Sequence, residues 1–525
     1  MSKIYTQGID AQEKLKQGVN KLANLVKLTI GPKGRNIVLD RKFATPLITN
    51  DGVTIAREFE VEDIYENMGI KLVKEVCNKT NDVAGDGTTT AIVLAQKMLN
   101  EGLKYCANDI SPIIINKGIN SAKDFCITLL KKKSKRISTI KEIENIATIS
   151  SQNNDVGKLI ASAYEKIGNS GNITLQDSKT TNTEVIFQDG MSFNKGFLSP
   201  YFCNNNDKTQ VNFEECYLLV VNSKISNFSQ LLGLLEQILK AKKPLLIICD
   251  EIENEALSTL IVNNVRGVFN CCVIKSPLYG DKKLAMLEDI AVLCNTCVIS
   301  QTSQKTFENI TLEDLGLLKQ VKITKDTTTF VAKNTNKELL NNRISCIKNQ
   351  IESCQIDFDK EQLKNRLANL VGGVATILVG ANTDIEQQEK KLRIEDAISA
   401  TSSALEEGIS SGGGIALLKL KTELKKFIKK LPEQEKVGAE IVYNTLSAPI
   451  NQILENAGLN KDVIINKITK NQNLNFGYDA MNNKYCDMIK NGIIDPTKVI
   501  TTALTNAVSV VTTMLTTVGL VSDKD

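Results

Sequence analysis

The sequence of 525 residues contains no histidine and no tryptophan. The absence of histidine excludes a Ser-His-Asp catalytic triad and any histidine-ligated metal site. Catalysis must therefore use carboxylates, hydroxyls, lysines, cysteines or metal-bound water. An excess of one charge is also lacking, because 64 basic residues face 60 acidic ones. This balance argues against nucleic acid or an anionic membrane as the main partner.

The thirteen cysteines are an odd number and mostly stand alone in the sequence, which is typical of a reducing compartment and not of a disulfide framework. Cys294 and Cys297 have the spacing of a redox or metal pair, but a single pair is a weak signal. We find no secretory signal pattern at the N-terminus and no run of eighteen apolar residues. We therefore expect a cytoplasmic protein without a membrane partner.

A chain of this length exceeds what one hydrophobic core usually supports, so two or three domains are expected. Apolar residues at three- and four-residue steps predict helices at both ends of the chain, whereas the middle alternates between strands and helices. A nested insertion explains this order better than consecutive domains. The predicted helices are 11–28, 64–76, 88 onward, 156–167, 229–241, 253–266, 384–407, 437–457 and 497–516, and the predicted strands are 36–39, 46–49, 172–176, 184–187, 216–221, 244–249 and 267–274.

The segment Asn81–Thr90 predicts an anion-binding turn that leads into a helix. Gly85 and Gly87 permit backbone angles closed to other residues, and the threonines Thr88–Thr90 would open a helix whose free N–H groups attract phosphate. A carboxylate beside a phosphate needs a hard cation between them, so Asp86 is interpreted as a magnesium ligand. The alternative for this segment is an ordinary capped surface helix.

Three further segments are ambiguous on their own. Ser411–Gly414 is a glycine cluster before a helix, which suits either a ligand contact or a flexible linker. Asp396 lies on a predicted helix, where acidic residues are usually solvated. Asp495 precedes Pro496 and would by itself be read as a helix cap.

The segments Thr29–Asn36, Asn50–Thr54, Asn81–Thr90, Ser411–Gly414 and Gly492–Lys498, taken together, resemble the group I chaperonins of the GroEL type. The resemblance extends from the first helix to about residue 522. It implies a multi-domain α and α/β fold: a mainly helical equatorial ATP-binding domain (1–132 and 407–525), a small α+β intermediate domain (133–189 and 375–406) and an inserted α/β apical domain for substrate binding (190–374). It also implies homo-oligomeric rings of seven subunits, usually stacked in pairs.

The resemblance further implies a site for ATP, Mg²⁺ and K⁺. Asp86 would hold the magnesium, and Asp396 would orient and polarise the water that attacks the γ-phosphate, with Asp51 as a helper. Asp396 would lie on the intermediate domain, so hydrolysis would require that domain to close, with hinges at Gly408, Gly190 and Gly372–Gly373. The implied nucleotide contacts are Thr29, Ile30, Gly31, Pro32, Asn50, Asp51, Asp86, Gly87, Thr88, Thr89, Thr90, Gly413, Asp479, Ala480, Met481 and Asp495.

The apical domain would present an apolar groove for which non-native polypeptides and a GroES-type co-chaperonin compete. Such a surface binds through apolar area with little sequence discrimination. The alternative for the same residues is ordinary core packing. The implied groove residues are Phe197, Tyr201, Phe202, Leu232, Leu235, Leu257, Ile261 and Val262.

Three positions depart from the family pattern. Asn50 replaces a common lysine, Ile137 replaces a proline at the lower hinge, and Asp479 replaces an asparagine, which would place a negative charge near the adenine. The leading hypothesis is nevertheless an ATP-dependent chaperone that captures and encloses non-native chains. The alternatives are a small-molecule kinase, for which no acceptor signal is present, and an ATPase-deficient polypeptide-binding or scaffold protein, which the intact Asp51, Asp86 and Asp396 disfavour.

Overall fold

The structure is a computed structural model that describes residues 3–41, 44–106, 110–168, 172–178, 180–205, 209–226, 228–278, 280–300, 307, 309–354 and 357–523. The chain divides into two compact units. The first comprises Met1–Ser162, Lys179–Asn182 and Val379–Asp525, and the second comprises Ala163–Ser178 and Thr183–Leu378. Both chain ends thus belong to the first unit. The finer division into three domains stays a prediction.

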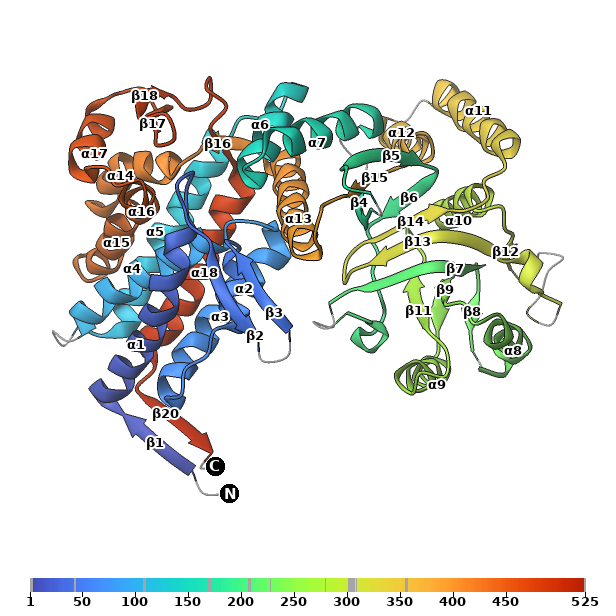
Figure 1. Ribbon diagram of the computed structural model, residues 1–525, viewed down its shortest axis with the longest axis horizontal. Coiled ribbons are helices and arrows are strands. Elements are labelled where there is room, and N and C mark those ends of the chain that lie inside the picture. Colours follow the sequence, from blue (N-terminus) through green and yellow to red (C-terminus); the bar gives the residue numbers. More distant parts are fainter. Residues whose placement is uncertain are drawn as a thin grey trace. The chain divides into compact units, whose positions relative to one another are not determined.

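Long helices form the core of the first unit, and α18 (Thr497–Thr516) packs against α3, α4 and α5 (Figure 1). This helix is long and apolar enough to cross a membrane, but 67% of its apolar window is buried inside the protein. That burial is typical of the core helix of a globular unit. The other long helices of the bundle are α1 (Gly8–Val26), α3 (Ile64–Ala84), α4 (Thr88–Cys106), α5 (Pro112–Lys133) and α15 (Glu433–Thr445).

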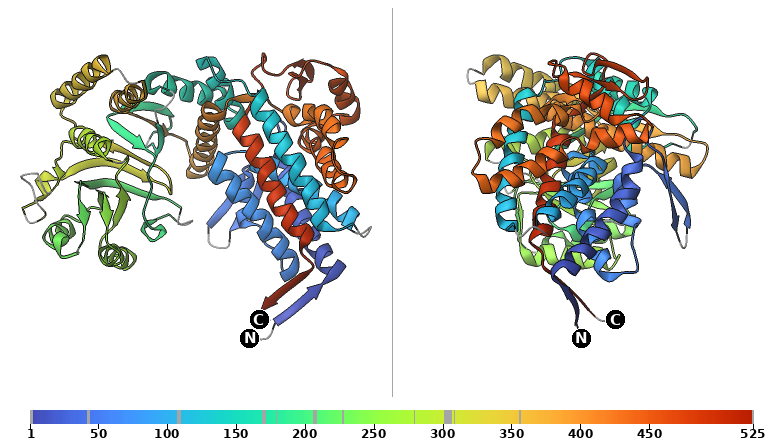
Figure 2. Two further views of the ribbon diagram at one scale, coloured as in Figure 1. Left: turned by 180° about the vertical axis from the view of Figure 1, so that it is seen from behind. Right: turned by 90° about the vertical axis from the view of Figure 1, so that its left-hand side faces the viewer.

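Shorter elements surround this bundle. The N- and C-terminal strands β1 (Lys3–Gln7) and β20 (Gly519–Asp523) pair antiparallel, so the two chain ends lie side by side (Figure 2). The other antiparallel pairs are β2 (Ile37–Arg41) with β3 (Ala44–Thr49), β16 (Ile409–Ser411) with β19 (Ile494–Pro496), and β17 (Phe476–Asp479) with β18 (Lys484–Asp487). The remaining helices are η1 (Lys27–Thr29), α2 (Gly52–Glu58), α6 (Ile140–Ser151), α7 (Asn154–Ile167, which continues into the second unit), α13 (Asp384–Glu407), α14 (Ile415–Ile428), α16 (Ala448–Asn456) and α17 (Lys461–Lys470).

The second unit is built on a seven-stranded mixed sheet. Its strand order is β11 (Cys271–Lys275), β9 (Leu245–Cys249), β7 (Val211–Val221), β13 (Gly316–Ile323), β14 (Thr328–Ala332) and β6 (Gly190–Phe193), with β12 (Val298–Ile299) also paired to β7. The strands β11, β9, β7 and β12 run parallel, and every residue of β9 is buried, as expected for a strand covered on both faces. The helices are α8 (Leu232–Ala241), α9 (Asn254–Val265), α10 (Asp281–Leu293), α11 (Lys337–Ser353), α12 (Asp357–Gly372) and the short η2 (Pro200–Phe202), η3 (Phe228–Leu231) and η4 (Leu312–Asp314).

Smaller sheets complete this unit. The strands β4 (Asn172–Asp177), β15 (Val374–Val379) and β5 (Glu184–Gln188) form a three-stranded sheet, and β8 (Lys224–Ile225) pairs parallel with β10 (Glu251–Ile252).

A buried ion cluster fixes three helices of the second unit to one another. Asp289 on α10 is fully buried. It accepts hydrogen bonds from Arg343 Nε on α11 and Arg366 Nε on α12, each at 2.7 Å. A buried carboxylate is costly without partners, so these two arginines stabilise the packing of α11 and α12 on α10.

The α and α/β fold class predicted from the sequence is confirmed. One predicted element is wrong, because the single helix 437–457 is two helices, α15 and α16, interrupted at Leu446 and Ser447. The cause is Pro449, which lies in the first turn of α16. Proline has no N–H to donate to a preceding turn and is tolerated only where a helix starts.

Candidate nucleotide site

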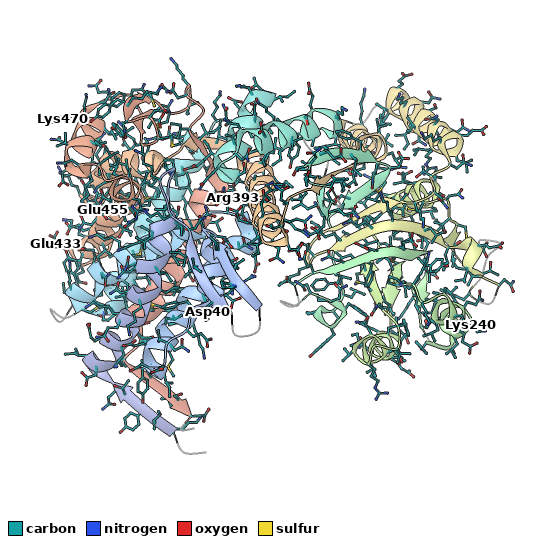
Figure 3. The ribbon with its side chains drawn as sticks, in the orientation of Figure 1. Asp40, Lys240, Arg393, Glu433, Glu455 and Lys470 are labelled. Carbon is teal, nitrogen blue, oxygen red and sulfur yellow. The ribbon has the colours of Figure 1, made fainter. Side chains whose placement is uncertain are left out.

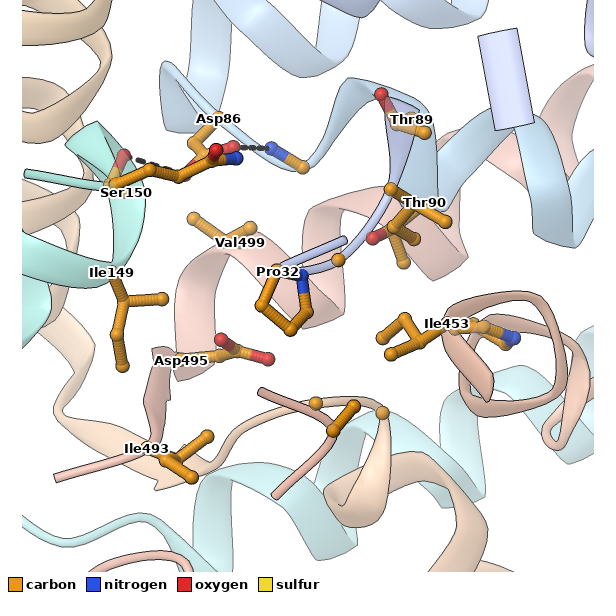
Figure 4. A pocket seen from close by; sticks show the side chains of 18 of the residues that line it. Pro32, Asp86, Thr89, Thr90, Ile149, Ser150, Ile453, Ile493, Asp495 and Val499 are labelled. Carbon is orange, nitrogen blue, oxygen red and sulfur yellow. Dashed lines mark hydrogen bonds between the residues drawn. The ribbon is translucent and has the colours of Figure 1, made fainter. Parts of the chain in front are cut away.

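A cavity of about 780 Å³ lies entirely within the first unit (Figure 4). Every residue for which we predicted a nucleotide or catalytic role lines this cavity. The lining residues are 29–32, 50–52, 81, 85–90, 148–150, 152, 154, 393, 396, 413, 414, 416, 417, 449, 450, 453, 454, 478–482, 488, 491, 493, 495, 496, 499 and 500. Long-range packing therefore gathers segments that are up to several hundred residues apart in the sequence.

The turn between α3 and α4 requires glycine at two positions. Gly85 ends α3 with φ +68° and Gly87 precedes α4 with φ +82°, both in the left-handed region. A Cβ atom on Gly87 would lie 2.5 Å from Val499 Cγ1, and one on Gly85 would lie 2.1 Å from Ser399 Cβ. The backbone can thus pass close to its neighbours, and α4 begins at Thr88 with its first N–H groups free of intrahelical partners.

Asp86 lies in this turn, where its carboxylate accepts hydrogen bonds from the Gly87 N–H and, at 3.0 Å, from Ser150 Oγ of α6 (Figure 4). The pKa of Asp86 lies above its ordinary value, mainly because the carboxyl group is buried. The charge of Asp51 raises the pKa further, whereas the two hydrogen bonds lower it. A cation bound at this carboxylate would favour its ionised form.

Asp51 has a structural role that the sequence prediction missed. It is the N-cap of α2, and its carboxylate accepts from the backbone N–H groups of Val53 (3.0 Å) and Thr54 (2.9 Å) and from Thr54 Oγ1 (2.6 Å). An Asp-Gly-Val-Thr sequence before a helix is compatible with such a cap. The capping hydrogen bonds hold the Asp51 carboxylate in one position at the cavity wall.

Asp396 lies on α13, which packs against α6 and α18 in the first unit. Burial raises the pKa of Asp396 well above its ordinary value, and the charges of Asp51 and Asp86 raise it further. In this structure Asp396 and Asp86 already line one cavity of one compact unit. The closure that we expected from the sequence is therefore not needed here to bring the two carboxylates to the same cavity.

The donor set suits a magnesium ion that is held together with phosphates. Among the described residues, no three acidic or cysteine side chains form a ready-made metal cage. Mg²⁺ typically binds through one or two carboxylates, substrate phosphates and waters, and it does not need such a cage. The charge of Asp51 raises the pKa of Asp86, and the charges of Asp51 and Asp86 raise the pKa of Asp396, which is the condition that a divalent cation relieves.

Apolar side chains also line the cavity, among them Pro32, Ile453 and Ile493, and we call these three together the apolar wall (Figure 4). Burial raises the pKa of Asp495 to about 7, helped by the charge of Asp86 and opposed by a hydrogen bond from the Gly413 N–H. A planar base fits against such a wall, and a polar group such as Asp495 can fix its orientation.

Asp479 does not present a free charge to the cavity. Its carboxylate accepts from the backbone N–H groups of Met481 (3.0 Å) and Asn482 (3.1 Å) and from Asn482 Nδ2 (2.8 Å). Burial would raise its pKa, but these hydrogen bonds outweigh burial and hold the pKa below the ordinary value. The carboxylate thus stabilises the turn after β17, which weakens our expectation that it disturbs adenine binding.

Residues 22–525 match the model of the TCP-1/cpn60 chaperonin family. The chain belongs to this chaperonin family. A solved structure with the same fold is the chaperonin gp146 from bacteriophage EL 2 (Pseudomonas aeruginosa), crystallised in the presence of ATP-BeFx. The TM-score is 0.71 at 20% sequence identity, and the match covers 99% of this chain and 100% of that chain. Family membership supports a chaperone role, and chaperonins generally hydrolyse ATP.

Several cavity residues of this chaperonin were not predicted from the sequence. They include Thr148, Ile149 and Ser150 of α6 and Arg393 of α13. Thr148–Ser150 lie in an ordinary amphipathic helix without a motif. Arg393 could have been found from its position one turn before Asp396, since residues at this spacing share a helix face.

In the second unit of this chaperonin, the predicted groove residues differ in exposure. Tyr201 is 64% exposed, Leu232 45% and Val262 44%, whereas Phe202 (1%) and Leu235 (3%) are buried. Phe197, Leu257 and Ile261 are partly buried against the core. The inclusion of Phe202 and Leu235 in an exposed surface is therefore corrected.

The reason is that the short helix η2 directs Tyr201 outward and Phe202 into the core, and that Leu235 lies on the buried side of α8. Asn264 Nδ2 of α9 donates to the Tyr201 carbonyl oxygen at 3.1 Å, which ties η2 to α9. Val265 and Val268, which we did not predict, are also exposed beside Val262 in the sequence. We call Tyr201, Val262, Val265 and Val268 the α9 strip.

Proposed function

We propose that this chaperonin binds ATP with Mg²⁺ in the cavity of the first unit and hydrolyses it to drive a cycle of polypeptide capture and release. One observation carries the proposal: Asp51, Asp86 and Asp396, from three separate segments, line the same cavity as the N-terminus of α4. Phosphoryl transfer needs mainly positioning and charge neutralisation, so carboxylates can serve it without histidine.

Each part of the cavity has an assigned task in this proposal. The glycine turn and Thr88–Thr90 bind the phosphates through backbone N–H groups and hydroxyls. Asp86 holds the Mg²⁺ ion, which neutralises phosphate charge when bound, and K⁺ is proposed as a second cation. The base contacts the apolar wall and the segment Asp479–Met481, and Asp495, which accepts from the Gly413 N–H, fixes its orientation. Asp396 orients the attacking water, and Asp51 supports it.

The substitution Asp396→Ala tests this assignment. We expect ATP affinity to change by less than about threefold and turnover to fall by at least about 100-fold, the typical contribution of a positioned acid or base. Isothermal titration and a phosphate-release assay measure the two quantities. Glu395→Ala, next to it on α13 but outside the cavity lining, is the control and should retain both. Normal turnover in Asp396→Ala would overturn the role of this residue.

The alternative of an ATPase-deficient scaffold predicts no turnover in the wild type. Like-charged carboxylates that line one cavity destabilise a fold that does not use them, so the presence of Asp51, Asp86 and Asp396 together favours an active site. Measurement of wild-type phosphate release decides between the two.

We propose that the α9 strip, together with Leu232, binds non-native polypeptides. Exposed apolar side chains that cluster on one helix and an adjoining turn bind extended or helical apolar segments without strict sequence preference. A co-chaperonin of the GroES type is proposed to compete for the same residues. We further propose that the protein is cytoplasmic and that it assembles into rings of seven subunits, stacked in pairs. Electron microscopy with and without ATP and the co-chaperonin would show the rings or their absence.

The substitution Val262→Glu tests the polypeptide surface, because a carboxylate in an apolar contact is costly. We expect capture of a denatured substrate, measured as suppression of its aggregation, to fall at least about tenfold while ATP turnover is kept. Leu339→Glu on α11 places the same charge at another exposed apolar position of the second unit and should leave capture unchanged. Equal capture by the two variants would move the binding surface elsewhere.

A further inference from the structure

The charge of the cavity lining is unbalanced. Five aspartates line it, namely Asp51, Asp86, Asp396, Asp479 and Asp495, whereas the single cationic side chain among the lining residues is Arg393. No lysine lines the described part of the cavity. A triphosphate carries about four negative charges, so a fixed positive group has a large effect on its binding in a partly buried site.

Arg393 lies on α13, three residues before Asp396, and is labelled in Figure 3. One end of its guanidinium group is anchored, because a terminal nitrogen is 2.5 Å from Glu389 Oε1 on the preceding turn. Its Nε atom is enclosed by protein atoms and has no hydrogen-bond acceptor among the residues that the structure describes, so Nε itself does not face the cavity.

The neighbouring cation on the helix is arranged differently. Lys390 is 2.8 Å from Glu386 Oε1 and donates to the carbonyl oxygen of Gly380 at 3.3 Å, and it does not line the cavity. Arg393 is therefore the cation of α13 that has a place in the cavity lining. Residues three apart on a helix share a face, so Arg393 and Asp396 serve the same end of the cavity.

We propose that Arg393 is a further nucleotide-binding residue, whose guanidinium group donates to the terminal phosphate of ATP and thereby selects the triphosphate over the diphosphate. This inference rests on the proposed function, because it takes the γ-phosphate to lie beside Asp396. Arginine is suited to this task, since its planar group stays charged and can bind Glu389 and a phosphate oxygen at the same time. A cis-acting arginine of this kind stabilises the charge that develops on the transferred phosphoryl group.

The test compares the affinities of full-length variants for MgADP and for the magnesium complex of the non-hydrolysable analogue adenylyl imidodiphosphate, by isothermal titration. A charge-assisted hydrogen bond predicts that Arg393→Gln weakens binding of the triphosphate analogue by about 10- to 100-fold. Binding of MgADP should change by less than about twofold. Arg393→Lys should show an intermediate loss, because it keeps the charge but not the planar group.

Two matched controls separate this role from a structural one. Glu389→Gln removes the charge of the anchor but keeps an oxygen that can accept from Arg393, and Lys390→Gln removes a neighbouring charge outside the cavity. Both variants should keep the wild-type preference for the triphosphate. The inference is overturned if Arg393→Gln keeps the wild-type ratio of the two affinities, if it weakens both nucleotides equally, or if Glu389→Gln reproduces its effect. A wild type that binds neither nucleotide would instead overturn the proposed function itself.

Discussion

The substitution Gly87→Ala tests whether the turn between α3 and α4 is the phosphate site. Gly87 has φ +82°, and an alanine Cβ there would lie 2.5 Å from Val499 Cγ1. The left-handed conformation costs a residue with a side chain about 1–2 kcal/mol. The steric overlap with a well-packed valine adds about 1–3 kcal/mol.

The turn relieves this strain by moving away from α18, and the backbone N–H groups at the start of α4 move with it. Because each 1.4 kcal/mol is a tenfold change in affinity, a loss of at least about tenfold is expected for ADP and ATP alike. The measurement is the dissociation constant of MgADP by isothermal titration, which does not depend on catalysis.

Two further variants make this result specific. Gly458→Ala has the same left-handed strain, with φ +68°, but its Cβ would meet no atom within 4 Å and Gly458 does not line the cavity. It should lower stability by about 1–2 kcal/mol and leave nucleotide affinity unchanged. The double variant Gly87→Ala/Val499→Ala removes the overlapping methyl group and should recover part of the affinity. Wild-type ADP affinity in Gly87→Ala would refute the assignment of this turn.

Two other predictions concern charge. The pKa of Asp495 is raised from an ordinary value of 3.8 to about 7, so the nucleotide-free fold binds this proton more tightly than the unfolded chain does. The fold therefore loses about 1.4 kcal/mol of stability per pH unit as the pH rises between about 4 and 7. Asp495→Asn should remove this loss, so that its melting temperature exceeds that of the wild type at pH 8 by more than at pH 5; parallel curves would contradict the burial of this carboxyl group. In the second unit, Arg366→Met leaves the buried Asp289 with one arginine fewer and should lower the free energy of unfolding by about 3–5 kcal/mol. The control Lys282→Met breaks an exposed pair with Asp359 and should lower it by at most about 1 kcal/mol. Urea unfolding measures both.

The sequence predicted the helices and the fold class well, because apolar spacing is a local property of each element. It failed at 437–457, where the apolar pattern continues across the break between α15 and α16 and only Pro449 signals it. It also assigned Phe202 and Leu235 to an exposed surface, since α8 and η2 carry apolar residues on both sides and spacing alone does not tell which side meets the core.

For the candidate site, the glycine turn was accessible to physical reasoning because its chemistry lies within ten consecutive residues. Asp396 was not accessible to such reasoning, because nothing in the sequence around it differs from other acidic residues on helices. Only the family resemblance identified it. Ser150 and Arg393 remained unrecognised, since their places at the cavity depend on how α6 and α13 pack in the first unit. The capping bonds of Asp51 and the turn bonds of Asp479 are likewise visible only in the structure.

The most direct test of the account is a structure of this chaperonin determined with MgADP and beryllium fluoride. The account predicts phosphate density against Gly87 and Thr88–Thr90, with a metal ion about 2.1 Å from an Asp86 carboxylate oxygen and the fluoride group beside Asp396. Nucleotide bound elsewhere, or a cavity that stays free of it at saturating concentration, would contradict the account.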